Sequence, residues 1–353
     1  MAEPDSLVTQ IKKLGEKLDE ARAMISQVFI GQDRVVDLAL ITILSGGHGI
    51  LVGLPGLGKT QLVETLSIVM GLDGNRVQFT PDLMPADILG SEVLDTASDG
   101  TKSFRFIKGP VFCQLLMADE INRASPRTQS ALLQAMQEKE VTIAGQNWQL
   151  GSPFHVLATQ NPIEQEGTYP LPEAQLDRFL LEIQVQYPDR MAEKDILLAT
   201  TGVEEPALSS VFASGQILEA QNLIRRIPVG DSVVELILDL VRAFRPEDPS
   251  ANNLVRENMR WGPGPRASQA LMLAIRSQAL LRGDLAPSAA DVALLAPAIL
   301  NPRMAMGFAA RSFLWVFSWL DTRFRIQDYW NMSKGAYYNM HRQMPLTHAE
   351  KYK

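Results

Sequence analysis

The sequence is poor in the residues that mark secreted, metal-binding or nucleic-acid-binding proteins. Its 353 residues include one cysteine, Cys113, which excludes an internal disulfide and is typical of a reducing compartment. The four histidines are scattered, and none lies at metal-ligand spacing from the cysteine. The formal net charge of -7 argues against a generally basic surface for nucleic acid, and a local basic channel within the acidic total is the alternative. We therefore expect a cytoplasmic protein that does not bind nucleic acid.

Long apolar runs are also lacking. A membrane-spanning helix needs roughly 20 consecutive apolar residues, and no stretch of the chain approaches that length. Hydrophobic residues nevertheless make up 46% of the chain, which is typical of a globular protein rather than a disordered one. A chain of this length can form two or three domains with a sizeable core.

The clearest motif is a glycine-rich turn between a predicted strand and a predicted helix. The apolar run GILVG at 49–53 is typical of a buried strand, and a helical pattern follows from Lys59 to about Met70. The turn fits the pattern G-x-x-x-x-G-K-[ST], whose members here are Gly53, Leu54, Pro55, Gly56, Leu57, Gly58, Lys59 and Thr60.

This pattern is suited to holding phosphate. Glycines allow successive backbone N–H groups to surround phosphate oxygens, and the helix N-terminus adds partial positive charge. Lys59 is expected to reach the β- and γ-phosphates of a nucleotide, and the hydroxyl of Thr60 is expected to bind Mg²⁺. The alternative is a chance match in an ordinary strand-to-helix turn.

A second candidate site lies at the end of another apolar run, LLMADE at 115–120. Open parallel sheets bind ligands at the carboxyl ends of their strands. Successive side chains of a strand point to opposite sides. Asp119 can therefore hold the Mg²⁺ shell while Glu120 polarises an attacking water as general base. The alternative is a strand that ends in a solvated acidic turn, but together with the glycine-rich turn the two acids predict nucleotide hydrolysis.

The order of the predicted elements indicates an α/β fold. Helical patterns occupy 7–28 and 33–44, and apolar runs typical of strands recur at 77–79, 113–118, 154–159 and 180–187. Ser125 is a good N-cap before Pro126, and the helix that it opens is expected to reach about Glu138. Strands that alternate with helices predict a parallel sheet covered on both faces.

The composition changes at Tyr187-Pro188-Asp189. Beyond this point helical patterns dominate, at 214–226, 231–243, 266–282 and 288–297, and a loop rich in Pro, Asn and Gly is predicted at 245–265. We therefore predict a nucleotide-binding α/β domain over 1–188, a small helical domain over 189–298, and an aromatic-rich extension over 299–353.

The extension holds three of the five tryptophans and four of the six tyrosines, and it includes GFAARSFLWVFSWL. Its apolar run of roughly a dozen residues is too short to span a bilayer. Three alternatives stay open: an interfacial or partner-docking helix, a helix packed on the helical domain, and a tail with little native structure. The first allows peripheral contact with the inner face of the membrane.

Six separated blocks agree in order and spacing with one protein family. The blocks are GQD at 31–33, FTPDLMPADILG at 79–90, GPVF with MADEINRASPRTQSALLQAMQEKEVT within 109–142, ATQNP at 158–162, LPEAQLDRFLL at 171–181 and GPGPRASQAL at 262–271. Over about 20–298 the chain resembles the MoxR family of AAA+ ATPases. The resemblance implies a P-loop AAA+ fold, a doubly wound parallel sheet with a C-terminal all-helical lid.

The resemblance also implies three further site residues. Asn161 resembles the sensor-1 residue, an amide that can orient the attacking water, and an Asn-Pro turn is the alternative. Arg178 resembles the arginine finger that a neighbouring subunit supplies to the transferring phosphoryl group. Arg266 resembles sensor 2, the lid arginine that touches the γ-phosphate from the same chain. For both arginines the alternative is a solvated surface residue.

A function and partners are implied as well. We expect an ATPase that uses ATP and Mg²⁺ and forms a homo-oligomeric ring, with a hexamer as the expected size. The family suggests chaperone-like remodelling of client proteins, often with von Willebrand factor A domain partners, in metal-cofactor insertion or complex assembly. Two predicted hairpins, at 91–106 and 140–150, either contact substrate at the ring centre or are plain solvent-exposed hairpins.

Two other functions stay open on the sequence alone. A metal-chelatase motor subunit would use closely related AAA+ architecture, and an ATP-gated scaffold would bind ATP with little turnover. A DNA helicase or loader is disfavoured by the acidic balance and by the lack of a basic or aromatic recognition stripe in the ATPase core.

Overall fold

A computed structural model describes residues 6–96, 102–163, 167–202, 206–213 and 215–306. The chain divides into two compact units, Met1–Leu223 and Ile224–Lys353. The predicted aromatic-rich extension lies outside the described residues from 307 onward. Among the described helices, none has the length and apolar character needed to cross a bilayer.

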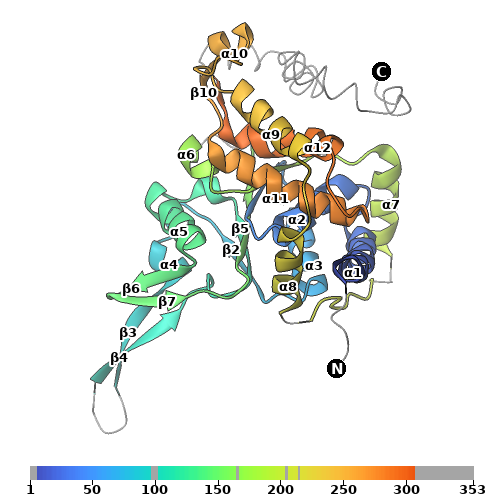
Figure 1. Cartoon of the computed structure of the whole chain (residues 1–353). Coiled ribbons are helices and arrows are strands. Elements are labelled where there is room, and N and C mark those ends of the chain that lie inside the picture. The colour runs from blue at the N-terminus through green and yellow to red at the C-terminus, as the bar shows by residue number, and fades with distance from the viewer. Residues whose placement is uncertain (1–5, 97–101, 164–166, 203–205, 214, 307–353) are drawn as a thin grey trace. The chain divides into compact units, whose positions relative to one another are not determined.

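The first unit is built around a five-stranded parallel sheet with the strand order β2-β5-β8-β1-β9 (Figure 1). The strands are β1 (Gly49–Gly53), β2 (Gly74–Gln78), β5 (Leu115–Asp119), β8 (His155–Gln160) and β9 (Leu181–Val185). The order puts the carboxyl ends of β5, β8 and β1 side by side, which is where open α/β sheets bind ligands.

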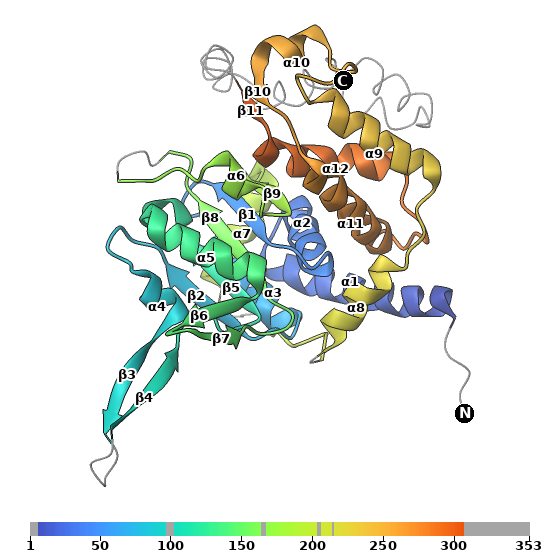
Figure 2. The ribbon, with the colours of Figure 1, turned by 60° about the vertical axis from the view of Figure 1, so that its left-hand side comes forward.

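Helices cover both faces of this sheet (Figure 2). The helices of the first unit are α1 (Leu7–Val28), α2 (Asp33–Leu44), α3 (Lys59–Val69), α4 (Pro85–Leu89), α5 (Pro126–Glu138), α6 (Glu173–Leu176) and α7 (Arg190–Thr201), with a 3-10 helix at Ile121–Arg123. α8 (Gln216–Arg225) includes the boundary between the two units in the sequence. α4 and α5 share a buried cluster with Ile50, Leu116 and Val156 of the sheet. α2 contacts β9, α3 contacts β2 and β5, and α1 packs on both helices. The predicted α/β architecture is confirmed.

Local sequence explains where two of these helices begin. Ser125 Oγ accepts a hydrogen bond from the backbone N of Thr128 at 3.4 Å, and Pro126 takes the first helical position of α5, as predicted. Asp189 Oδ1 caps α7 by accepting bonds from the backbone N–H groups of Met191 and Ala192, both at 2.9 Å.

Burial raises the pKa of the Cys113 thiol to about 12, so the single cysteine is a small buried apolar residue, as expected.

Two antiparallel hairpins extend from the first unit, and both were predicted. They consist of β3 (Gly90–Thr96) with β4 (Lys102–Lys108), and of β6 (Glu140–Ile143) with β7 (Gln146–Gln149). The β3–β4 hairpin projects away from the sheet in both views (Figures 1 and 2). The ring centroids of Phe106 and Trp148 lie 4.6 Å apart, so the two hairpins pack against each other. Residues 97–101, between β3 and β4, lie outside the described residues.

The second unit is mainly helical. Its elements are α9 (Asp231–Ala243), α10 (Asn253–Asn258), β10 (Met259–Trp261), α11 (Pro265–Leu281), α12 (Ala289–Leu300), a 3-10 helix (Asn301–Arg303) and β11 (Ala305–Met306). α11 packs against α9 and α12. The fully buried carboxylate of Asp291 caps α12 through Ser288 N at 2.7 Å and pairs with Arg282 Nη2 at 2.9 Å. The predicted helical lid is confirmed.

Local details differ from the sequence predictions. Residues 245–265 were predicted as a loop, which is wrong, because they contain α10 and β10. Met259 and Trp261 form strand β10 by pairing with Met306 and Ala305 of β11, and such a distant partner is not visible in local composition. α7 was not predicted, and it belongs to the compact unit that ends at Leu223, whereas the composition changes at 187–189.

Candidate functional site

The turn between β1 and α3 has the backbone shape that its glycines permit. Gly56 and Gly58 have φ angles of 80° and 73°, in the left-handed region that other residues rarely adopt. Gly58 is the N-cap of α3, which begins at Lys59. At Gly53 a Cβ would lie 2.5 Å from the carbonyl oxygen of Val185 on β9. The predicted phosphate-type turn therefore forms at the carboxyl end of β1, and its first residue, Gly53, packs tightly against β9.

Lys59 carries the positive charge of this turn. Its Nζ donates to the carbonyl oxygens of Gly53 and Leu54, each at 2.6 Å. Burial lowers the pKa of Lys59, and the charges of Asp119 and Glu120 act in the opposite direction. The amine therefore lies within electrostatic reach of both acids that the sequence analysis assigned to the same site.

Asp119 ends β5 and is held from the strands on either side. Its Oδ1 accepts a hydrogen bond from Thr159 Oγ1 on β8 at 2.6 Å. Its Oδ2 lies 2.7 Å from Nη2 of Arg76 on β2, in an ion pair whose aspartate side chain is 12% exposed and whose arginine is 47% exposed. A neutral donor fixes one oxygen of the carboxylate and a charged donor fixes the other.

Glu120 follows in a left-handed backbone conformation, with a φ of 56°. Its backbone N–H donates to Thr159 Oγ1 at 2.8 Å. In the side chain, Oε2 accepts bonds from Gln78 Nε2 at 2.7 Å and from Arg123 Nη1 at 2.9 Å. Both bonds end on the same oxygen, so they orient the carboxylate without using Oε1. Strained backbone of this kind is found most often at functional sites.

The other three predicted residues lie in separate places. Asn161 follows β8 directly and is 6% exposed, and its Oδ1 accepts a bond from Ile163 N at 3.2 Å, as in an Asn-Pro turn. Arg178 lies after α6 and donates from Nη1 to Leu133 O on α5 at 2.6 Å. Arg266 is the second residue of α11, in the second unit. Within the described part of the first unit, Asn161 and Arg178 are not among the bonded partners of the lysine and the two acids.

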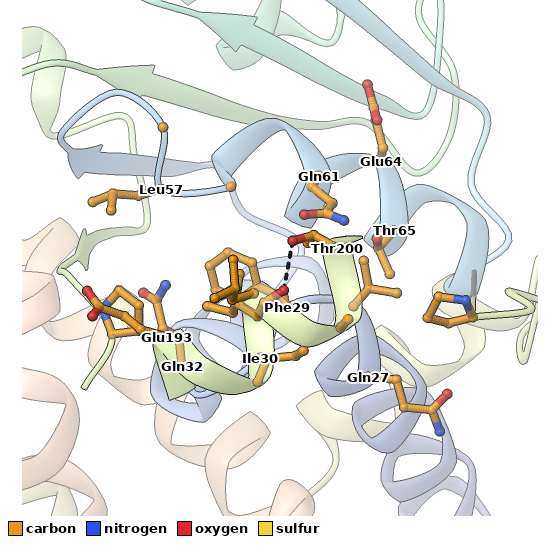
Figure 3. Close-up of a pocket in the computed structure, with 18 of the residues that line it drawn as sticks. Gln27, Phe29, Ile30, Gln32, Leu57, Gln61, Glu64, Thr65, Glu193 and Thr200 are labelled. Carbon is orange, nitrogen blue, oxygen red and sulfur yellow. Dashed lines mark hydrogen bonds between the residues drawn. The ribbon is translucent and has the colours of Figure 1, made fainter. Parts of the chain in front are cut away.

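A half-open pocket of about 870 Å³ lies beside the phosphate-type turn, within the first unit (Figure 3). Its walls come from the end of α1 and the loop that follows, from the turn itself, from α3 and from α7. Lining side chains include the apolar Phe29, Ile30, Leu57, Ile68 and Leu197, and the polar Gln32, Gln61, Glu64, Glu193 and Thr200. Apolar and polar side chains therefore share the walls of this pocket.

One contact under the glycine-rich turn and one hydrogen bond within α7 lie in the walls of this pocket. Phe29 is buried, and its ring lies 3.3 Å from the position that a Cβ of Gly58 would take, so the aromatic side chain packs directly under the turn. On α7, Thr200 Oγ1 donates to the carbonyl oxygen of Ile196 at 2.7 Å (Figure 3). α7, which was not predicted from the sequence, supplies Ile196, Leu197 and Thr200 to one wall of the pocket.

Sequence reasoning also missed four residues that hold the two acids. Arg76 and Gln78 lie on β2, Thr159 lies on β8, and Arg123 lies one turn after Glu120. A signal was present on β2, because Arg76 and Gln78 flank the buried Val77 and therefore share one face of the strand. Their contact with the acids depends on the pairing of β2 with β5 and could not be read locally.

Comparisons with known proteins agree with this geometry. Residues 48–181 match the ATPase family associated with various cellular activities (AAA), and residues 251–312 match the AAA lid domain. The chaperone MoxR1 of Mycobacterium tuberculosis is 40% identical over 293 residues, which cover 83% of this chain and 77% of that protein. The chain belongs to the MoxR family of AAA+ ATPases. A second MoxR protein, from Paracoccus denitrificans, is 32% identical over 302 residues and covers 79% of this chain and 86% of its own.

Two further similarities extend over most of this MoxR-family chain. The uncharacterized protein YeaC of Bacillus subtilis is 40% identical over 292 residues, which cover 82% of this chain and 87% of that protein. The crystal structure of a candidate ATPase from Cytophaga hutchinsonii has a TM-score of 0.81 and 33% identity, and the match covers 95% of this chain and 97% of that chain. The predicted MoxR resemblance and AAA+ fold are confirmed.

Proposed function

We propose that this MoxR-family protein binds ATP with Mg²⁺ and hydrolyses it to ADP and phosphate. The observation that carries the proposal is the placement of three residues at the carboxyl edge of one sheet: Lys59 begins the helix after the turn that follows β1, and Asp119 and Glu120 lie at the end of β5. The charges of both carboxylates act on the lysine. A turn that only holds phosphate has no use for a second oriented acid. Glu120 is therefore assigned as the general base that takes a proton from the attacking water.

The residues present suit a magnesium nucleotide. The backbone N–H groups of residues 56–60 and the amine of Lys59 suit phosphate oxygens. The hydroxyl of Thr60 and the carboxylate of Asp119 are the hard oxygen ligands that Mg²⁺ prefers, and the bound ion would neutralise phosphate charge. The apolar walls of the pocket, including Phe29 and Leu57, suit a purine base.

The chain's own residues orient the reacting groups. Gln78 and Arg123 fix Oε2 of Glu120, which assigns Oε1 to the attacking water. Asn161 follows the strand next to β5 and is assigned to orient the same water. Arg266 is assigned to contact the γ-phosphate from the lid of the same chain, and lid movement would couple hydrolysis to work on a partner.

The proposed assembly is a homo-oligomeric ring, with six subunits as the expected size. Arg178 is assigned to the site of the neighbouring subunit as its arginine finger. The name of the M. tuberculosis relative, a chaperone, supports remodelling of client proteins. We also propose that the protein works with a von Willebrand factor A domain partner, in metal-cofactor insertion or complex assembly. The proposed location is the cytoplasm.

Glu120→Gln tests the hydrolytic role. We expect the ATPase rate to fall at least about a hundredfold, because the amide cannot accept the proton from water. The Kd for ATP, measured by calorimetry, should stay close to the wild-type value because the phosphate-binding turn is intact. A wild-type rate that is already negligible and does not change in the variant would instead support an ATP-gated scaffold.

Mixing two inactive variants tests the shared site. Lys59→Ala lacks the phosphate-binding amine but keeps Arg178, and Arg178→Ala has the opposite defect. At a 1:1 ratio about a quarter of the wild-type rate should return, because half of the sites keep the lysine and half of their neighbours keep the arginine. Full activity of Arg178→Ala in dilute monomeric protein would contradict the assignment.

A further inference from the structure

Arg76 is the charged partner of the carboxylate that the proposed function assigns to the Mg²⁺ shell. Its Nη2 lies 2.7 Å from Oδ2 of Asp119. The other oxygen, Oδ1, accepts the hydrogen bond from Thr159 at 2.6 Å. The guanidinium thus holds the carboxylate oxygen that the threonine does not use.

The two partners differ in their freedom to move. β2, which carries Arg76, is a terminal strand of the sheet, and the arginine side chain is 47% exposed against 12% for the aspartate. The guanidinium also donates to Gln78 Oε1, through a longer bond of 3.3 Å. An arginine at the edge of a sheet can move its charged end into solvent, whereas the buried aspartate cannot follow it.

Electrostatics opposes the presence of both cations at one carboxylate. A buried acid needs a positive partner, and Arg76 fills that need for Asp119. A divalent cation at Oδ2 is repelled by the same guanidinium, and repulsion between a single and a double charge a few ångströms apart in water is worth about a factor of ten in affinity. Arg76 and Mg²⁺ therefore compete for the same oxygen.

We propose that Arg76 sets the Mg²⁺ concentration at which this protein binds nucleotide. The guanidinium holds Asp119 in position and leaves Oδ2 when the divalent cation binds. This inference rests on the proposed function, since it takes Asp119 as the residue of the Mg²⁺ shell. Arg76 is a positioning residue, because it acts through Asp119 and not on the nucleotide.

The test measures binding rather than turnover. The full-length protein is titrated with MgCl₂ at a fixed concentration of a fluorescent ADP analogue, and the Mg²⁺ midpoint of nucleotide binding is recorded. In Arg76→Gln, which keeps a hydrogen-bond donor but removes the charge, the midpoint should fall about tenfold. In Arg76→Lys, which keeps the charge, it should stay near the wild-type value. Metal-free binding of the analogue should be similar in all of them.

Arg105→Gln is the matched control. Arg105 also pairs with an aspartate, Asp95, at 3.3 Å, but both side chains are exposed on the β3–β4 hairpin. Removing that charge should leave the Mg²⁺ midpoint unchanged. Arg76→Met, which keeps an unbranched stem, is the second neutral variant in case Arg76→Gln does not fold.

The outcomes separate the inference from the function beneath it. Equal midpoints in the wild type and a folded neutral Arg76 variant would overturn the inference and leave nucleotide binding intact. Loss of metal-free nucleotide binding in a folded neutral variant would also overturn it, because Arg76 would then act on the nucleotide itself. A wild-type protein that shows no Mg²⁺-dependent nucleotide binding would refute the proposed function instead.

Discussion

The carboxylate of Glu120 and the guanidinium of Arg123 meet at 2.9 Å, three residues apart on a single 3-10 turn. The contact depends on the left-handed backbone at Glu120, which turns the chain sharply after β5. Gln78 donates to the same oxygen from the edge strand. The orientation of the proposed base is therefore fixed both by its own turn and by a neighbouring strand.

Arg123→Gln should lower the ATPase kcat about three- to tenfold, because the carboxylate of Glu120 loses one of its two orienting bonds. The Kd for ATP should be unchanged, since Arg123 has no assigned contact with phosphate. Steady-state kinetics with calorimetry separates the two quantities. Arg127→Gln, on the exposed side of α5, is the control and should behave as wild type. A changed Kd with an unchanged kcat would contradict a positioning role.

The glycines of the phosphate-type turn should tolerate alanine to different degrees. Gly53→Ala places a Cβ 2.5 Å from Val185 O, so β1 and β9 must separate, and we expect a loss of about 3 kcal/mol of unfolding free energy. Around Gly56 there is open space, and Gly56→Ala should cost about 1 kcal/mol through its positive φ alone. Urea unfolding gives both values, and a Gly56 variant less stable than the Gly53 variant would contradict this ranking.

His48 and His155 are both buried, near the starts of β1 and β8. His48 Nδ1 accepts a bond from Val156 N at 3.0 Å, and His155 Nδ1 donates to Gly47 O at 2.8 Å. Burial lowers the pKa of His48 to about 3 and that of His155 to about 4. The positive charge of Lys139 acts in the same direction on both.

Protein stability should therefore fall in mild acid. Below the ordinary histidine pKa of 6.5 the unfolded chain takes up protons that the folded protein does not, so this contribution to stability is complete above pH 6.5 and declines toward pH 4. Each histidine contributes about 1.4 kcal/mol per pH unit over that window. Urea unfolding of the wild type and His155→Gln should show a shallower decline in the variant. Identical declines would rule out His155 as a source.

In the lid, Arg282→Gln should lower the unfolding free energy by about 2 kcal/mol. The variant leaves the fully buried carboxylate of Asp291 without its charged partner, and the partial exposure of Arg282 moderates the loss. Arg282 also pairs with Asp284, which is exposed, so Asp284→Asn is the control and should change stability little. Thermal melting of the two variants compares them directly, and equal losses would show that burial at Asp291 does not matter.

Features set by a few neighbouring residues were readable from the sequence. Ser125 and Pro126 mark the start of α5 wherever the helix lies, and the strand–turn–helix order around residues 49–70 defines its own conformation. The two acids could be assigned because a strand end and a pair of carboxylates are also local signals.

Contacts made across the sheet were not readable. Arg76 reaches Asp119 only because β2 pairs with β5, and a local pattern does not state which strands will be neighbours. The same limit hid β10, whose partner strand β11 follows α12. α7 was missed for another reason: Ala192 is its one residue described as buried, so the apolar stripe that marks a core helix is nearly absent.

The hydroxyl of Thr159 ties the ends of two central strands together, since it donates to Asp119 and accepts from the backbone of Glu120. A slip of β8 by one residue would offer Ala158 or Gln160 to the acids instead, and neither could reproduce both bonds with one small group. Insertions and deletions within β8 should therefore not be tolerated. The single oxygen atom Oγ1 of Thr159 therefore sets the register of β8 relative to the two acids at the end of β5.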